Sequence, residues 1–166
     1  LSPREFARLL AQSLAGLERE LPSGTLDPAE ASALHQVRRT AELIAASDPG
    51  SDSGTEIHHG GEASWTVTFD HGPADPAPCL GRTVRVVPLT DVEQLPELIA
   101  RVGAHLQTVG TAGLGDRSKG LAVSLGRAGV SRVVPFAAVP FPPPWWHHDG
   151  GTPLGDLVRW VYLEGS

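Results

Sequence analysis

The sequence predicts an α/β fold built on an open, mostly parallel sheet with flanking helices. The main reason is an alternation between residues 82 and 135, where segments of strand, helix, strand, helix and strand character follow one another. Such alternation favours parallel strands joined by right-handed crossovers. The composition agrees with a folded domain, because 40% of the 166 residues are hydrophobic and 19% are charged.

Two amphipathic helices are expected before this alternating region. The first begins at Ser2-Pro3, which suit an N-cap and a first turn, and it stops at Pro22-Ser23-Gly24. The second begins at Asp27-Pro28-Ala29-Glu30, which is a capping-box pattern. Apolar residues at helical spacing should face a core; they are Phe6, Leu9, Leu10, Leu14, Leu17 and Leu21, followed by Leu34, Val37, Ala41 and Ile44.

Residues 47–61 are expected to form a polar loop, because Gly, Ser and Asp dominate the segment. His58-His59-Gly60-Gly61 lies within it and has Glu56 and Glu62 nearby. These residue types can bind a metal, but we prefer a solvated loop without a function. A strand should follow at residues 65–69, and a Pro-rich connection at residues 71–78.

In the alternating region, strands are predicted at residues 82–88, 105–110 and 131–135. Thr90 should cap the helix after the first strand, with Glu93 completing a capping box, and Gly129 should end the next helix. A last helix should begin at Thr152-Pro153. The expected inward residues of the three helices are Val92, Leu95, Ile99 and Val102, then Leu121, Leu125 and Ala128, then Leu154, Leu157, Val158 and Val161.

These segments predict a single partial domain over residues 1–166. It would consist of a helical hairpin at 1–46, a variable loop and strand at 47–78, and an α/β core with a C-terminal helix at 79–166. The sequence starts at Leu1 and contains no Met, so we expect a piece of a longer polypeptide.

Charge and composition argue against several classes of partner. The net charge is −6 and there is no basic run, so nucleic acid is not an expected partner. No apolar run approaches the roughly 20 residues that span a bilayer. The single cysteine excludes an internal disulfide and a cysteine-based zinc cluster. We expect a cytoplasmic protein.

The most unusual segment runs from Pro142 to Gly151, with the sequence Pro-Pro-Pro-Trp-Trp-His-His-Asp-Gly-Gly. Three prolines forbid a helix, and two tryptophans place large apolar surfaces on an irregular backbone. His147, His148 and Asp149 allow an acid–base pair, a metal site or a structural corner. A metal is not expected, because adjacent histidines rarely reach one ion and no further ligands are apparent.

Four phrases of the sequence follow one another in a characteristic order. They are Leu106-Gln107-Thr108-Val109-Gly110, Gly129-Val130-Ser131-Arg132-Val133-Val134-Pro135, His148-Asp149-Gly150 and Leu157-Val158-Arg159-Trp160. In this order they resemble the C-terminal part of LuxC-type acyl-CoA reductases, which belong to the aldehyde dehydrogenase superfamily. The strand at residues 82–88 fits the same family, and the resemblance covers most of the chain.

The resemblance implies an NADPH-dependent reductase that converts a fatty acyl thioester, carried by CoA or by an acylated protein, to an aldehyde. A cysteine would take up the acyl group as an acyl-enzyme. In the superfamily the nucleophile and the dinucleotide domain lie N-terminal to the matched region. The chain would then contain no catalytic nucleophile, would leave NADPH mainly to the upstream half of the enzyme, and would be inactive alone. Superfamily members commonly assemble, so a second copy is another candidate partner.

The resemblance also implies a role for the Pro142–Gly151 segment, since the equivalent loop of the superfamily approaches the acyl tunnel. The substrate-lining candidates are Trp145, Trp146, His147, His148 and Asp149. Cys79 is expected to be structural, because no helix N-terminus or nearby cation would lower its pKa.

An alternative interpretation belongs to a different class of function. The chain would be a non-catalytic α/β interaction module that presents Trp145 and Trp146 to a protein partner, since exposed tryptophan is frequent at interfaces.

Overall fold

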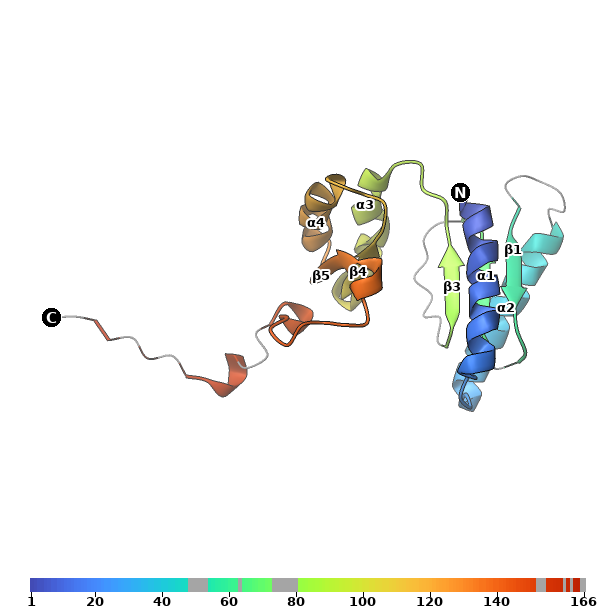
Figure 1. Cartoon of the computed structure of the whole chain (residues 1–166), viewed down its shortest axis with the longest axis horizontal. Coiled ribbons are helices and arrows are strands. Elements are labelled where there is room, and N and C mark those ends of the chain that lie inside the picture. Colours follow the sequence, from blue (N-terminus) through green and yellow to red (C-terminus); the bar gives the residue numbers. More distant parts are fainter. Residues whose placement is uncertain are drawn as a thin grey trace. The chain divides into compact units, whose positions relative to one another are not determined.

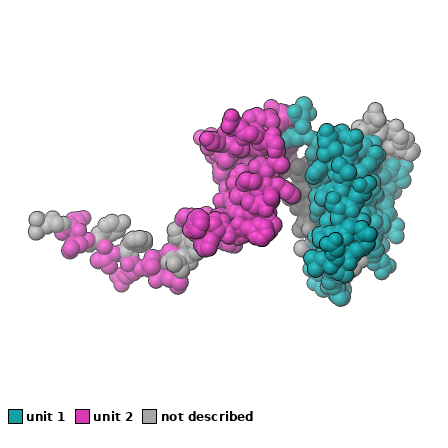
Figure 2. Space-filling view, viewed as in Figure 1, with its two compact units in different colours: residues 1–90 teal, residues 91–166 magenta. Residues whose placement is uncertain are grey.

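The computed structural model of the chain describes residues 1–47, 54–62, 64–72, 81–151, 155–159, 161 and 163–164. The chain divides into two compact units, Leu1–Thr90 and Asp91–Ser166 (Figure 2). The predicted α/β class with mostly parallel strand pairing is confirmed. The described strands form two small sheets, one in each unit, and each sheet is covered by helices of its own unit.

The first unit contains two long helices and three strands, labelled in Figure 1. The sheet has the order β1-β2-β3, in which β2 pairs antiparallel with β1 and parallel with β3. The elements are α1 (Pro3–Glu20), α2 (Pro28–Ser47), β1 (Glu56–His59), β2 (Thr66–Phe69) and β3 (Thr83–Val86).

The caps of both helices agree with the sequence. Ser2 Oγ accepts a hydrogen bond from the Glu5 backbone N–H, and the Glu5 carboxylate accepts one from the Ser2 backbone N–H. Asp27 and Glu30 form the same reciprocal arrangement at the start of α2.

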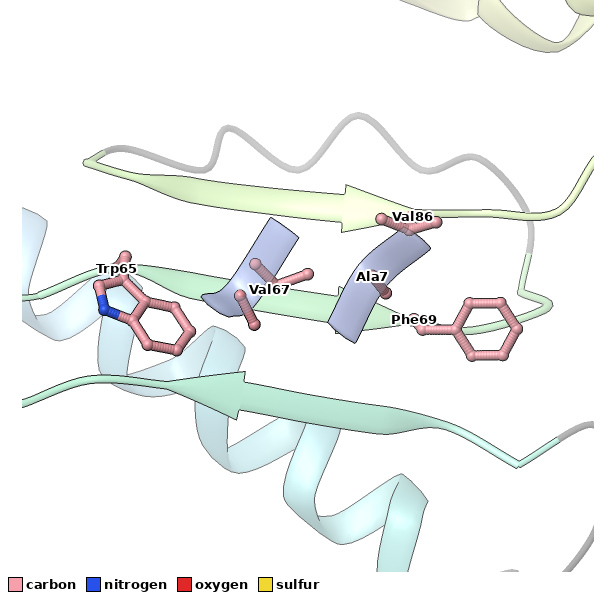
Figure 3. Packing of buried hydrophobic residues seen from close by; sticks show 6 residues of the cluster. Ala7, Trp65, Val67, Phe69 and Val86 are labelled. Atoms are coloured by element: carbon pink, nitrogen blue, oxygen red, sulfur yellow. The ribbon is translucent and has the colours of Figure 1, made fainter. Parts of the chain in front are cut away.

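The central strand β2 is buried on both of its faces. Trp65, Val67 and Phe69 pack with Ala7 of α1, as the close view in Figure 3 shows, and Ala11 belongs to the same cluster. The alternate residues Thr66 and Thr68 lie on the face toward α2, where α2 contributes the buried Arg38. The unit is therefore a sheet between two helices.

Arg38 connects α2 to the chain around β2. Its Nε donates to Thr66 Oγ1 at 2.8 Å, and its two Nη atoms donate to the carbonyl oxygens of residues 61, 62, 64 and 65. Burial lowers the pKa of this guanidinium, which Glu42 partly offsets. The charge is accommodated by main-chain dipoles.

The predicted inward faces of the two helices are only partly correct. In α1 the contact is made by the small residues Ala7 and Ala11, with Leu10 and Leu14 beside them, so the buried stripe is narrower than predicted. The exposed members of the predicted faces are Phe6, Leu9, Leu17, Leu21 and Ile44.

The prediction of a polar loop at residues 47–61 is wrong for its second half. Residues 56–59 form β1, an edge strand whose pairing partner is β2. Residues 48–53 of the predicted loop lie outside the described residues, as do most of the Pro-rich connection and Cys79.

The second unit is built on the parallel pair β4 (Thr108–Thr111) and β5 (Arg132–Pro135), joined by α4 (Arg117–Arg127). The predicted helix before β4 is divided into a 3-10 turn (Val92–Gln94), α3 (Leu95–Ile99) and a second 3-10 segment (Ala100–His105). Its predicted cap, Thr90, is wrong, because the Asp91 side chain accepts the Glu93 N–H. Gly129, with φ 106°, follows α4 as predicted.

The core of the second unit is formed by helices on one face of the β4–β5 pair. Leu121 and Leu125 of α4 are fully buried, together with Val130. Partly buried residues surround them; these are Val92, Leu95, Ile99, Leu106, Val109, Leu114 and Val133.

The predicted last helix is not formed by the described residues after Gly151. Residues Gly155–Leu157 make a 3-10 turn, and Leu157, Val158 and Val161 are exposed instead of facing inward. A short amphipathic helix needs a surface to pack on, and these side chains have none. Thr152, Pro153 and Leu154 lie outside the described residues.

Candidate functional site

The candidate site is the irregular segment from Phe136 to Gly151, here called the tryptophan loop. It leaves the end of β5 and lies on the face of the β4–β5 pair opposite the helices. Side chains alternate along a strand, so Val109 and Val133 join the helix-side core while Gly110 and Arg132 face the loop.

Gly110 lets the beginning of the loop approach β4 closely. A Cβ atom at this position would lie 2.7 Å from Val139 Cγ2 and 3.0 Å from Phe136 Cδ2. The backbone Cα of Phe136 would also be only 3.3 Å away. The first turn of the loop therefore occupies the space that a side chain on β4 would fill.

Arg132 of β5 binds the middle of the loop through its guanidinium group. Only 8% of this residue is exposed. Its Nη1 donates to the Val139 carbonyl at 2.8 Å, and its Nη2 donates to the Ala138 and Phe141 carbonyls at 2.7 and 3.3 Å. Its guanidinium also lies 5.5 Å from the centre of the Trp146 ring, within the range of a cation–π contact.

Three of the predicted site residues come together at the end of the loop. The rings of Trp146 and His148 have centroids 4.9 Å apart. His148 Nδ1 lies 3.0 Å from Asp149 Oδ2, and Gln107 Nε2 donates to the other carboxylate oxygen, Oδ1, at 3.0 Å. The group is an imidazole–carboxylate pair beside an indole, joined to the start of β4 by an amide.

Gln107 is the functional candidate that sequence reasoning missed. Its backbone carbonyl accepts three hydrogen bonds, from Ser131 N, Ser131 Oγ and Arg132 N, at 3.0 to 3.1 Å. Its side chain reaches Asp149 in the loop, 42 positions further along the chain. The available signal was its place in the Leu-Gln-Thr-Val-Gly phrase, but no local pattern indicates so distant a contact.

The backbone at the pair is held in a tight turn. Asp149 has φ 51° and ψ 31°, and it is the one non-glycine residue with positive φ among those described. Aspartate tolerates this left-handed region better than most residues, and Gly150 follows it with φ 79°. The turn directs adjacent His148 and Asp149 side chains toward each other.

All of the predicted site residues except Trp146 are exposed. Trp145 has 76% of its surface accessible, as does Phe141, and His147 is exposed as well. The loop thus has a bound side, formed by Trp146, and an open side with large aromatic rings. The His148 ring packs on the Trp146 ring, and the Asp149 carboxylate accepts a hydrogen bond from the Gln107 side chain.

The His58-His59 segment forms a separate polar cluster in the first unit. Glu56 lies between Arg8, at 2.8 Å, and Arg4, at 3.2 Å, and its other oxygen is 3.2 Å from His58 Nε2. Burial raises the pKa of Glu56, but the hydrogen bonds from Arg8 and His58 and the nearby charges outweigh it, so the pKa lies below its usual value. Within the described ranges, no group of three or more His, Cys, Asp or Glu side chains is placed to hold a metal.

The turn from β4 into α4 does not fit the diphosphate of a dinucleotide. The turn from β4 into α4 has glycines with positive φ at 113 and 115, but Asp116 stands at the N-cap of the helix. A carboxylate at that position opposes a phosphate. As far as the structure describes the chain, no helix is both long and apolar enough to cross a membrane.

The chain was compared with models of protein families and with curated proteins. A search of curated proteins found none similar to the chain. The family model of the acyl-CoA reductases (LuxC) matches residues 1–160, which include the first unit, most of the second and the whole tryptophan loop. Gln107, Arg132 and the His148–Asp149 pair, which the fold brings together, all lie in this range. The chain therefore belongs to the LuxC acyl-CoA reductase family.

Proposed function

We propose that the chain is the C-terminal portion of the catalytic domain of an NADPH-dependent reductase that converts a fatty acyl-CoA to an aldehyde. The acyl group would pass through a cysteine acyl-enzyme, with the cysteine and the cofactor domain upstream. The aldehyde-dehydrogenase-like architecture and a cytoplasmic location belong to the same proposal, and homo-oligomers are expected.

The observation that carries this proposal is that residues from three of the four sequence phrases that resemble the family lie close together at the tryptophan loop. Gln107 from the first phrase, Arg132 from the second and His148-Asp149 from the third are connected by hydrogen bonds and ring contacts at the tryptophan loop. A loop fixed in this way can present a constant surface to a ligand, because the conformational entropy of the loop is already lost on folding and not on binding.

Within the proposed enzyme, the tryptophan loop lines the acyl-thioester site. Trp145 and Trp146 offer apolar surface for the acyl chain, and His147, His148 and Asp149 offer polar groups near the thioester. NADPH supplies the reducing equivalent when it is bound. We do not assign NADPH binding to the turn before α4, because Asp116 stands at the N-cap of that helix.

The test compares the 166-residue chain with the full-length enzyme. Only the full-length protein should oxidise NADPH when acyl-CoA is added, and an aldehyde should accumulate in the same molar amount. NADPH oxidation by the isolated chain would refute the proposed division of the enzyme. Absence of turnover by the full-length protein, over a range of acyl-chain lengths, would refute the proposed function.

A second candidate function is favoured by the open side of the loop. Trp145 and Phe141 are each 76% exposed, and Phe136 is 70% exposed, as expected for a surface that binds a protein partner. Trp145→Ala distinguishes the two functions in the full-length protein. In a substrate-lining loop it should raise KM for long-chain acyl-CoA, whereas a binding module should keep its kinetics and lose its partner in a pull-down.

A further inference from the structure

We propose that the open side of the tryptophan loop docks on the surface of a lipid bilayer. Phe136, Phe141 and Trp145 would enter the boundary between the headgroups and the acyl chains of the lipid. The inference is independent of the proposed reaction. It is carried by the exposure of these three rings and by the hydrogen bonding of the backbone that holds them.

The first observation is an exposed apolar surface in a segment without charge. Residues 133–146 contain no Asp, Glu, Lys, Arg or His, and the indole N–H of the two tryptophans is their one type of hydrogen-bonding side-chain group. Phe136 is 70% exposed, and Phe141 and Trp145 are each 76% exposed. Three solvated aromatic rings in one short segment indicate a surface that is covered by an apolar partner.

The second observation concerns the backbone of the same segment. An irregular chain does not ordinarily contact the interior of a membrane, because each unpaired N–H or C=O group is costly away from water. Four of the eight residues 139–146 are prolines, which have no N–H group. Three further N–H groups are satisfied inside the loop by carbonyl oxygens three positions earlier; they belong to Val139, Phe141 and Trp146.

Arg132 satisfies carbonyl groups of the same segment. Its guanidinium donates hydrogen bonds to the carbonyl oxygens of Ala138, Val139 and Phe141. The residue is itself buried, so its charge does not have to leave water when the loop contacts lipid. The loop is therefore an irregular segment whose backbone requires few hydrogen bonds from water, which is the property that contact with lipid demands.

Area favours a bilayer over a protein as the partner. Aromatic side chains bury about 150–250 Å² each when they are fully covered, so the three exposed rings offer roughly 300–550 Å². A standard protein–protein interface covers about 800 Å² of each partner and contains hydrogen bonds across it. A lipid surface requires neither a minimum area nor directional hydrogen bonds, and tryptophan is enriched at the boundary between membrane and water.

Charge determines which kind of lipid surface fits. The net charge of the chain is −6, and residues 133–146 carry no cation that could attract an anionic headgroup. Binding should therefore depend on apolar contact, and a zwitterionic phosphatidylcholine surface suits the loop better than an anionic one.

The test measures how the full-length enzyme partitions onto phosphatidylcholine vesicles, without NADPH or acyl-CoA. The wild type should float with the vesicles in a density gradient. Phe141→Ser should lower the partition coefficient by about tenfold or more, since covering a phenylalanine side chain accounts for at least that factor. Phe141→Leu keeps an apolar side chain and should bind nearly as well as the wild type. Leu43→Ser changes a residue of α2 that is 70% exposed, and as the matched control it should leave the partition unchanged.

Fluorescence identifies the part of the protein that meets the lipid. Acyl chains brominated close to the headgroup should quench the tryptophan emission of the wild type. Trp145→Phe keeps an aromatic ring, so it should retain the partition and lose part of the quenching. Equal quenching in the wild type and Trp145→Phe would overturn the placement of Trp145 in the lipid.

Three results would overturn the proposal as a whole. They are a wild type that stays outside the vesicle fraction, equal partition of the wild type and Phe141→Ser, and a partition that disappears at high salt, which would indicate an electrostatic contact in place of apolar insertion. Capture of a protein partner that depends on Trp145, without vesicle binding, would assign the open side to the second candidate function instead. None of these measurements involves turnover, so a failure of the proposed reductase activity would be recognised separately.

Discussion

Replacement of Arg132 by methionine should detach the tryptophan loop from the β4–β5 pair. The guanidinium makes two short hydrogen bonds to loop carbonyls, at 2.7 and 2.8 Å, and a longer one at 3.3 Å. Hydrogen bonds from a charged donor contribute about 1.5–3 kcal/mol each, and the cation–π contact with Trp146 adds about 0.5–2 kcal/mol. The cost of burying a residue that is only 8% exposed offsets part of this sum.

The net loss in the free energy of unfolding of the second unit should be about 3–5 kcal/mol, the usual result of removing one partner from a buried charged network. Such a loss is a large part of the stability of a domain, which is about 5–15 kcal/mol. Arg132→Lys keeps the charge but offers a single ammonium, which cannot reach three carbonyls in one plane, so its effect should be intermediate.

Two measurements check this prediction. Denaturant unfolding gives the change in free energy, and hydrogen exchange followed by mass spectrometry reports on peptides from residues 136–151. The amides of Val139 and Phe141, which donate to carbonyls within the loop, should exchange faster in Arg132→Met. A loss below about 1 kcal/mol together with unchanged exchange in the loop would refute the reasoning, since it would fall in the range of ordinary surface substitutions.

Three further predictions concern the packing and charges of the two units. Arg38→Met removes five hydrogen bonds and should destabilise the first unit by about 3–5 kcal/mol in denaturant unfolding; unchanged stability would contradict the role given to Arg38. Burial raises the pKa of Asp70, but the bonds from Arg85 and the Gly72 N–H outweigh it and lower the pKa, so its stabilising effect is present above about pH 4 and is lost as the pH falls through the folded pKa. Asp70→Asn should therefore weaken thermal stability at neutral pH and have little effect at low pH, and equal effects at both would argue against it. Gly110→Ala should lower the free energy of unfolding by about 1–3 kcal/mol, since the new methyl meets the loop, although alanine normally favours a strand over glycine; increased stability would show that the contact is absent.

The elements that could be predicted are those whose signals are local. Ser2 with Glu5 and Asp27 with Glu30 are capping boxes that act within one turn, and they start the helices as expected. The strands β2 to β5 were likewise expected from their β-branched residues, with differences of a few positions at their ends.

The elements that sequence reasoning missed depend on distant contacts. Strand β1 has the polar sequence Glu-Ile-His-His, and its polar groups are satisfied by Arg8 of α1 and by pairing with β2. In the tryptophan loop, the five lining candidates follow from the family resemblance, and their lining role stays a prediction. The contributions of Gln107 and Arg132 could not, since both arise from how the strands are placed beside the loop.

The position of the tryptophan loop on the β4–β5 pair has a consequence for how its length can vary. The loop is bound near its start at Gly110, in its middle at Arg132 and at its end at Gln107, so its path is fixed at three points. Insertions in surface loops are ordinarily well tolerated. Here one residue added or deleted between positions 139 and 148 would displace Trp146 from Arg132, Asp149 from Gln107, or both. Although it lacks regular secondary structure, the segment should respond to insertion scanning as a core strand does.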